Sequence, residues 1–166
     1  MKMIIENVVI ILLAGGIGNR FDKNISKQMI TYNNETILEK NILNFKKHFK
    51  EIPIQIVSNK KDLSKVREIT SKFKILDPVL GGKERQKSVY NGLKAIKKIN
   101  PKYVLVHDTA RPLVSSKVLN KLLEYIQKEI ICVVPTLNIS DAIRTRSKNL
   151  VTKVVSKQNK ILIQTP

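Results

Sequence analysis

The chain has 166 residues, 42% of them hydrophobic, which fits one folded domain with a sizeable core and argues against disorder. Lysine and arginine number 31 against 13 aspartate and glutamate, and the resulting formal net charge of +18 favours anionic partners such as nucleotides, sugar phosphates or nucleic acid. Aromatic residues make up only 5% and tryptophan is absent, so stacking platforms for single-stranded nucleic acid are poorly supplied.

The N-terminal apolar residues are too short a run for a signal peptide, because Glu6 and Asn7 interrupt them. No stretch approaches the ~20 consecutive apolar residues that a membrane-spanning helix needs. The single cysteine, Cys132, lies in the apolar run 130–134, and we expect it to be buried in the core. These features together predict a cytoplasmic protein.

The stretch 10–29 combines a buried strand with a loop suited to phosphate. Residues 8–13 have the length and branching of a buried parallel strand. The glycines that follow let the backbone turn toward a ligand, and successive N–H groups with two cations bind anions. No Gly-Lys-Ser/Thr closes the loop as in a Walker motif, and a glycine turn with two solvated cations is the alternative. The candidate residues are Ala14, Gly15, Gly16, Gly18, Arg20 and Lys27.

Downstream, segments with helical spacing of apolar residues alternate with short β-prone runs. In the helix expected at 84–98, Val89, Leu93 and Ile96 should face the core. Such alternation predicts an α/β fold, a mostly parallel sheet with helices on both faces. The loops after the strands should then meet at one edge of the sheet, where these folds bind ligands. Helices are predicted at 38–49, 62–72, 84–98 and 115–128, and strands at 53–58, 74–80, 103–107 and 130–135.

From residue 138 onward the pattern changes to short β-prone pieces. The runs 143–145 and 151–155 are separated by Ser147-Lys148-Asn149, which is typical of a hairpin turn. We expect a β-arm at about 138–160 that extends from the main sheet and serves dimerisation. The sequence stops with no helix to cover its last strand, so we expect residues 1–166 to be a single domain that lacks its C-terminal part.

A second loop with binding character begins at Gly81-Gly82. These glycines let backbone groups approach a flat ring edge-on, and Ser88 on the following helix can hydrogen-bond to a base. The alternative is a plain turn that leaves Glu84 and Arg85 on the surface.

A third loop follows the strand 103–107 and begins with Asp108. A carboxylate at this edge of the sheet suits Mg²⁺, which binds nucleotides through one or two carboxylates together with phosphate oxygens. A helix or turn cap is the alternative role for this aspartate.

Together the three loops resemble one family, the 2-C-methyl-D-erythritol 4-phosphate cytidylyltransferases, with the ribitol-5-phosphate cytidylyltransferases as close relatives. That family has an A-G-G-x-G-x-R loop, a P-K-Q segment, a G-G-x-x-R-x-x-S-V-x-x-G-L segment and a V-H-D-x-A-R-P loop. A T-P pair near the family's last strand matches Thr165-Pro166, so the resemblance covers essentially the whole chain in order. The other matching segments here are 14–20, 26–28, 81–93 and 106–112.

The resemblance implies a Rossmann-like nucleotidyltransferase of non-mevalonate isoprenoid biosynthesis that transfers CMP from CTP to methylerythritol phosphate and releases pyrophosphate. The acceptor phosphate would attack the α-phosphorus in line, with Arg20 and Lys27 as catalytic cations. Asp108 would face Mg²⁺ and the ribose, while Gly82 and Ser88 would read the base. The full set implied to bind CTP is Ala14, Gly15, Gly16, Gly18, Gly82, Ser88, Asp108 and Arg111.

For the acceptor phosphate, the resemblance points to two residues near the arm that are typically contributed by a dimer partner. The family has Asp-Thr before the arm, where this chain has Asp141-Ala142. It has an arginine within the arm, where Lys157 keeps the charge but not the bidentate fork. The implied partners are small molecules and a second copy of the chain. Ribitol phosphate as acceptor, a basic nucleic-acid-binding module and a non-catalytic paralogue are the alternatives.

Overall fold

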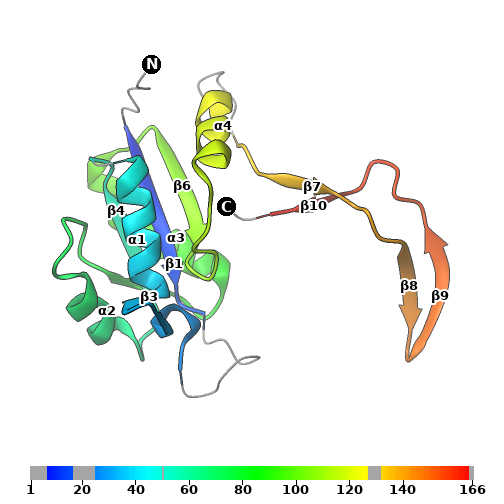
Figure 1. Ribbon diagram of the computed structural model, residues 1–166, viewed down its shortest axis with the longest axis horizontal. Coiled ribbons are helices and arrows are strands. Elements are labelled where there is room, and N and C mark those ends of the chain that lie inside the picture. Colours follow the sequence, from blue (N-terminus) through cyan, green and yellow to red (C-terminus); the bar gives the residue numbers. More distant parts are fainter. Residues whose placement is uncertain (1–6, 17–24, 50, 127–131, 165–166) are drawn as a thin grey trace.

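The computed structural model describes residues 7–16, 25–49, 51–126 and 132–164. Its centre is a parallel sheet with the strand order β5-β4-β1-β6 (Figure 1). Strand β1 lies inside the sheet and every one of its residues is buried, as expected for an unbroken apolar run. The α/β class predicted from the sequence is therefore confirmed. The sheet strands are β1 (Val8–Ala14), β4 (Ile54–Ser58), β5 (Val79–Leu80) and β6 (Tyr103–Asp108).

Helices cover both faces of the sheet, because the side chains of β1 alternate between two apolar clusters. Ile10 and Leu12 pack on the face that α1, α2 and α4 cover. Val9 and Ile11 pack on the opposite face, which α3 covers. The helices are α1 (Ile37–His48), α2 (Leu63–Thr70), α3 (Arg85–Ala95) and α4 (Ser116–Ile126), with the short 3-10 helices η1 (Lys27–Met29) and η2 (Lys97–Ile99).

Helix α3 lies very close to the sheet, because its inward face carries Gly92. A Cβ on this glycine would lie 2.9 Å from the Cγ2 atom of Val57, which is closer than side-chain atoms pack. The close contact turns the helix so that Leu93 is exposed, and the prediction that Leu93 faces the core is wrong. Val89 and Ile96 pack against the sheet as predicted.

The strand predicted at 74–80 is much shorter in the structure. Only Val79–Leu80 pairs with β4. Pro78 has no N–H to donate to a neighbouring strand. The Asp77 carbonyl accepts a hydrogen bond from the side chain of Gln55 at 2.9 Å, so it is taken from the sheet.

The strand predicted at 130–135 is not found in its described part. Residues 132–135 form no strand, and residues 130 and 131 lie outside the described residues. Cys132 is exposed at the start of the extended connection to the next strand, so the prediction of a buried cysteine is wrong. Its apolar neighbours misled the prediction, because Val133 next to it does pack against the core while Cys132 itself stays exposed.

A β-ribbon extends from the body of the molecule (Figure 1). Strands β7 and β10 pair antiparallel at its base, and β8 and β9 form a hairpin beyond them. The predicted turn Ser147-Lys148-Asn149 joins the hairpin strands, with Lys148 at a φ of 50°. The ribbon strands are β7 (Thr136–Asn138), β8 (Ile143–Ser147), β9 (Leu150–Val155) and β10 (Ile161–Ile163); a small pair, β2 (Thr31–Tyr32) and β3 (Glu35–Thr36), precedes α1.

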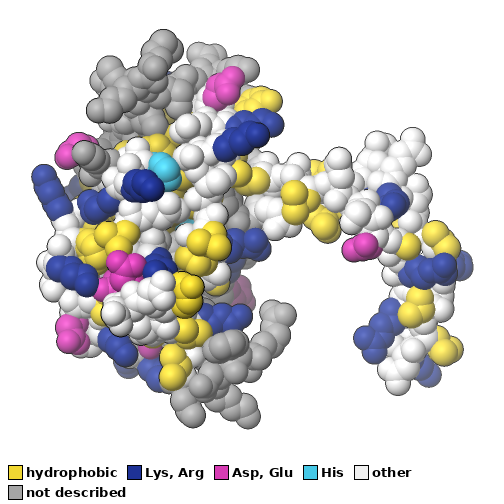
Figure 2. Space-filling model, in the orientation of Figure 1, with side chains coloured by type: hydrophobic (Ala, Val, Ile, Leu, Met, Phe, Trp, Pro, Cys, Tyr) yellow, Lys and Arg dark blue, Asp and Glu magenta, His cyan; other side chains and the backbone are white. Residues whose placement is uncertain are grey.

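Lysine and arginine side chains are spread over the face seen in Figure 2, on both the body and the ribbon. They do not gather there into the continuous stripe that a nucleic-acid groove would need. Within the described ranges, none of the helices has the length and apolar character to cross a membrane.

Helix α1 begins at a capping box formed by Thr36 and Glu39. The Thr36 hydroxyl accepts a hydrogen bond from the Glu39 N–H at 3.1 Å, and the Glu39 carboxylate accepts one from the Thr36 N–H at 2.7 Å. The ammonium of Lys72 donates to the same carboxylate. Burial would raise the pKa of Glu39, but the hydrogen bonds from Lys72 and Thr36 outweigh it and hold the pKa below its usual value.

This lowered pKa makes part of the stability depend on pH. Ionised Glu39 stabilises the fold above the pKa of the unfolded chain, and the contribution is lost as pH falls through the lower folded value. Near neutral pH, Glu39→Gln should lower the free energy of unfolding by about 1 kcal/mol. The difference from wild type should shrink as pH falls below the ordinary range of a glutamate pKa, as measured by urea denaturation at several pH values.

The matched control is Glu35→Gln, which removes an ion pair with Lys40 in which the carboxylate is more exposed, 40% against 9% for Glu39. Exposed pairs contribute little, so this variant should unfold nearly like wild type at every pH. A Glu39→Gln difference that stays constant down to low pH would contradict the role given to the ionised carboxylate.

Candidate active site

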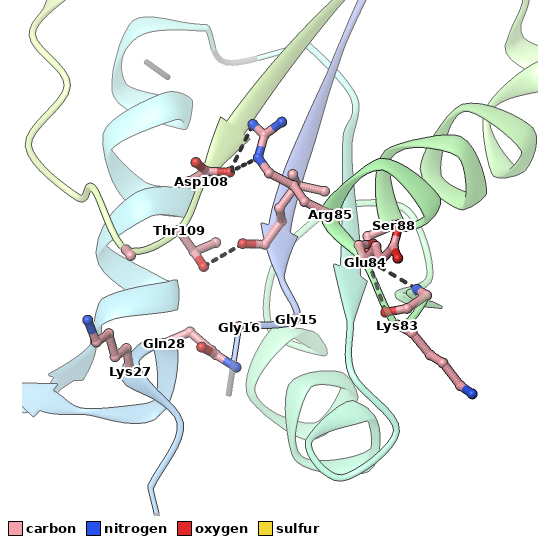
Figure 3. A pocket seen from close by; sticks show the side chains of 13 residues that line it. Gly15, Gly16, Lys27, Gln28, Lys83, Glu84, Arg85, Ser88, Asp108 and Thr109 are labelled. Carbon is pink, nitrogen blue, oxygen red and sulfur yellow. Dashed lines mark hydrogen bonds and ion pairs between the residues drawn. The ribbon is translucent and has the colours of Figure 1, made fainter. Parts of the chain in front are cut away.

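The loops after β1, β5 and β6, together with η1, line a pocket of about 630 Å³ at the carboxyl ends of the parallel strands (Figure 3). The sequence predicted that these loops meet at this edge. Parallel α/β sheets bind their ligands there, where loops from several strands converge. The lining residues are Leu13, Gly15, Gly16, Lys27, Gln28, Gly82, Lys83, Glu84, Arg85, Ser88, Asp108, Thr109 and Ala110.

The first loop brings backbone to the pocket directly after β1. Gly15 and Gly16 line the pocket, and among the described residues a Cβ on Gly16 would meet no atom within 4 Å. Ala14 is fully buried, and its carbonyl accepts a hydrogen bond from Gln28 Nε2 at 2.7 Å. The loop is therefore anchored at its start and open where it faces the pocket.

Of the two predicted catalytic cations, Lys27 lies at the pocket. It is the first residue of η1, in which Gln28 and Met29 are buried and attach the segment to the body. Arg20 lies outside the described residues, as does Gly18.

The second loop is held by Ser88 on α3. The Ser88 hydroxyl accepts a hydrogen bond from the Gly82 N–H at 3.0 Å and donates one to the Glu84 carbonyl at 3.1 Å. A Cβ on Gly82 would lie 2.2 Å from the Cγ of Lys87, and a Cβ on Gly81 would lie 2.8 Å from the Ser88 hydroxyl. Packing therefore requires both glycines, and Ser88 shapes the backbone that lines the pocket.

The third loop places Asp108 at the end of β6. Its Oδ1 atom lies 3.2 Å from Nε and 3.1 Å from Nη2 of Arg85, so an ion pair links β6 to α3 beside the pocket (Figure 3). Thr109 is buried and donates its hydroxyl to the Leu13 carbonyl at 2.8 Å. Asn41 of α1 donates to the Thr109 carbonyl at 2.8 Å, which fixes the loop from the helical layer.

Two carboxylates line the pocket within the described residues, those of Asp108 and Glu84. No group of three or more His, Cys, Asp and Glu is arranged to hold a metal ion in this part of the chain. Mg²⁺ needs only one or two carboxylates when a nucleotide supplies phosphate oxygens. Asp108, with its side chain 28% exposed, meets that requirement.

A family model described as 2-C-methyl-D-erythritol 4-phosphate cytidylyltransferase matches residues 8–166, a range that includes all three loops. The chain belongs to this family. The recognition made from the loop motifs is therefore confirmed.

Relatives named for this family are similar to the chain over most of its length. A 2-C-methyl-D-erythritol 4-phosphate cytidylyltransferase of Clostridium beijerinckii is 37% identical over 161 residues, which cover 94% of this chain and 70% of the relative. A bifunctional enzyme IspD/IspF of Pelagibacter ubique is 37% identical over 160 residues, which cover 96% of this chain and 42% of the relative. The chain thus spans less than half of the bifunctional relative.

Solved structures of family members have the same fold. The bifunctional IspDF of Campylobacter jejuni aligns with a TM-score of 0.77 at 26% identity, over 96% of this chain and 40% of that one. The 2-C-methyl-D-erythritol 4-phosphate cytidylyltransferase of Francisella tularensis aligns with a TM-score of 0.72 at 27% identity, over 96% of this chain and 70% of that one.

Three residues that the family resemblance assigned to substrate are not among the residues that line the pocket. Arg111 Nη1 donates to Gln164 Oε1 at 3.1 Å, which ties the third loop to the end of the ribbon. Asp141 and Lys157 are exposed on the ribbon, where the Lys157 ammonium donates to the Ser140 carbonyl at 3.0 Å. The residues that the pocket does bring together with Lys27 are Gly15, Gly16, Gly82, Ser88 and Asp108.

Sequence reasoning gave no role to several polar residues that support the pocket. Gln28 is 2% exposed and lines the pocket beside Lys27. Asn41 is fully buried on α1 among the apolar side chains of Leu38, Ile42 and Phe45. A polar side chain at a core position must find hydrogen-bond partners, and that signal was present in the helical pattern.

We expect Ser88→Ala to loosen the second loop without unfolding the protein. The Gly82 N–H would lose its acceptor, so its hydrogen exchange measured by NMR should rise about fivefold, as for a bond worth about 1 kcal/mol. Ser71→Ala is the matched control, because the Ser71 hydroxyl donates to the Glu68 carbonyl at the exposed end of α2. Unchanged exchange at Gly82 would exclude the assigned role of Ser88.

Proposed function

We propose that this chain carries the CTP-binding part of an enzyme that transfers CMP from CTP to 2-C-methyl-D-erythritol 4-phosphate. The products are 4-diphosphocytidyl-2-C-methyl-D-erythritol and pyrophosphate, in non-mevalonate isoprenoid biosynthesis. The observation that carries the proposal is the pocket lined by all three motif-bearing loops. The relatives described above are named for the methylerythritol substrate, so we favour it over ribitol phosphate.

In this reaction an oxygen of the acceptor phosphate attacks the α-phosphorus of CTP, and pyrophosphate leaves on the opposite side. Negative charge on the phosphate oxygens makes positioning and cationic stabilisation the main contributions of the protein. We assign the cationic role to Lys27, which lies at the pocket, and to Arg20. The backbone N–H groups of the first loop, from Ala14 through Gly18, bind phosphate oxygens in this scheme.

Base recognition is assigned to the second loop. Its Gly82 backbone lines the pocket, and the Ser88 hydroxyl holds that backbone in place. Asp108 is assigned to the ribose and to Mg²⁺, which neutralises phosphate charge when bound. Its ion pair with Arg85 keeps the carboxylate oriented toward the pocket, and Arg111 is assigned to the edge of the nucleotide.

Contacts to the acceptor phosphate are assigned to Lys157 and Asp141 from a second copy of the chain. The ribbon that carries both residues extends away from its own body (Figure 1). Its apolar side chains Leu150, Val151 and Val154 are 68–71% exposed, and a homodimer formed through the ribbon would bury such side chains. We propose a homodimer on this basis, and the cytoplasmic location stays a prediction.

Calorimetric titration with CTP and with ATP in Mg²⁺ buffer tests the nucleotide half of the proposal. We expect CTP to bind at least about tenfold more tightly than ATP. Backbone groups positioned for the hydrogen-bonding edge of cytosine would leave polar groups unpaired against adenine. A chain that melts cooperatively but binds no CTP would refute the proposal. Turnover of the full-length protein with methylerythritol phosphate and with ribitol phosphate then decides the acceptor.

Lys27→Ala in the full-length protein should lower kcat about 100-fold or more while it weakens CTP binding by less than about tenfold. The reason is that the ammonium gains interaction energy as charge develops on the phosphate oxygens. Steady-state kinetics and titration measure the two effects separately. Lys94→Ala, which removes an exposed lysine of α3, is the control and should change neither. Equal losses in kcat and in CTP affinity would contradict the role of Lys27.

A further inference from the structure

Gln28 is buried beside Lys27 and uses both hydrogens of its amide group. Nε2 donates to the Ala14 carbonyl at 2.7 Å and to Asp62 Oδ2 at 2.9 Å. Both partners are acceptors, so the orientation of the amide is fixed, with its nitrogen toward them. A side chain that is 2% exposed and bonded at two points has little freedom to move.

Asp62, which accepts one of these hydrogen bonds, is itself held in place by further hydrogen bonds. It is 7% exposed and lies just before α2, where its backbone carbonyl accepts the hydrogen bond from the Val66 N–H at 2.8 Å. The Asn59 side chain donates to Asp62 Oδ2 at 2.7 Å and accepts from the Asp62 N–H at 2.8 Å. The carboxylate therefore belongs to a rigid connection between β4 and α2.

The network joins the end of β1 and the helix η1, which both contribute residues to the pocket lining, to the β4–α2 connection. Helix η1 has only three residues, so its own hydrogen bonds fix Lys27 weakly and its anchors must do so. We propose that Gln28 and Asp62 are positioning residues that set Lys27 for CMP transfer. This inference rests on the proposed function.

Gln28→Glu in the full-length protein tests the proposal. It replaces the donor by a carboxylate that faces the Ala14 carbonyl and the Asp62 carboxylate, so the bridge is lost. We expect kcat to fall about 10- to 100-fold, as when a reacting group moves by about 1 Å, with the KM for CTP changed less than about threefold. Combining this substitution with Asp62→Asn places an amide donor opposite the new carboxylate at position 28. The hydrogen bond between the two side chains is then restored, and part of the kcat should be recovered.

Gln55→Glu is the matched control. Gln55 is also 2% exposed, and its Nε2 donates to the carbonyls of Ile56 at 3.1 Å and Asp77 at 2.9 Å, outside the pocket lining. This variant should melt earlier but keep its kcat. A loss of kcat equal to that of Gln28→Glu would show a general effect of destabilisation and would overturn the proposal.

A double-mutant comparison asks whether Gln28 acts through Lys27. In a Lys27→Ala background, Gln28→Glu should lower kcat by less than about threefold, because no ammonium remains to be misplaced. If the fold-losses of kcat from Lys27→Ala and Gln28→Glu multiply in full, Gln28 acts independently of Lys27 and the positioning role is rejected. If Gln28→Glu does not fold, Gln28→Met removes the donor without a buried charge and replaces it in both experiments.

The outcomes separate this inference from the proposed function. A folded full-length protein that transfers no CMP refutes the proposed function, and the inference with it. An active protein in which Gln28→Glu leaves kcat unchanged refutes only the positioning role.

Discussion

Backbone pairing of β1 with its two neighbours sets the level at which the functional loops leave the sheet. Ala14 at the end of β1 pairs with Ser58 of β4, and Leu13 pairs with Asp108 of β6. These strands run parallel, and β5, which carries the second loop, pairs in parallel with β4, so the three functional loops begin at one edge of the sheet. The pocket thus depends on the burial of β1, because a shift of its register would separate the loops.

Side chains beneath the loops then remove the freedom that loops of this kind normally have. Gln28 donates a hydrogen bond to the end of β1, Ser88 accepts one from the second loop, and Asn41 donates one to the third loop. Each of these residues is buried and belongs to a helix, so the helical layers on both faces of the sheet contribute to the pocket. A preorganised site of this kind loses little energy to reordering when a charged ligand binds.

The sequence was sufficient for the α/β class, the four helices and the position of the pocket, because these follow from apolar periodicity and from glycines after strands. Predictions from the sequence were wrong or incomplete where contacts between distant parts of the chain decide the structure. Gly92 brings α3 so close to the sheet that Leu93 turns outward, and no periodicity reports that distance. Likewise, the bond between Gln28 and Asp62 joins residues 34 positions apart, and nothing local in the sequence pairs them.

The net charge of the chain was a weaker guide to its ligand than the loop motifs were, and the charges that line the pocket show the reason. Its described lining carries the cations Lys27, Lys83 and Arg85 but also the carboxylates of Glu84 and Asp108, so it is far closer to neutral than the chain's +18. Under the proposed function, affinity for a nucleotide then comes from directed groups, which are the backbone N–H donors after β1 and the two cations assigned to the phosphates, Lys27 and Arg20. The remaining lysines raise the rate of encounter with polyanions in a salt-dependent way, whereas the anchored loops decide which polyanion stays.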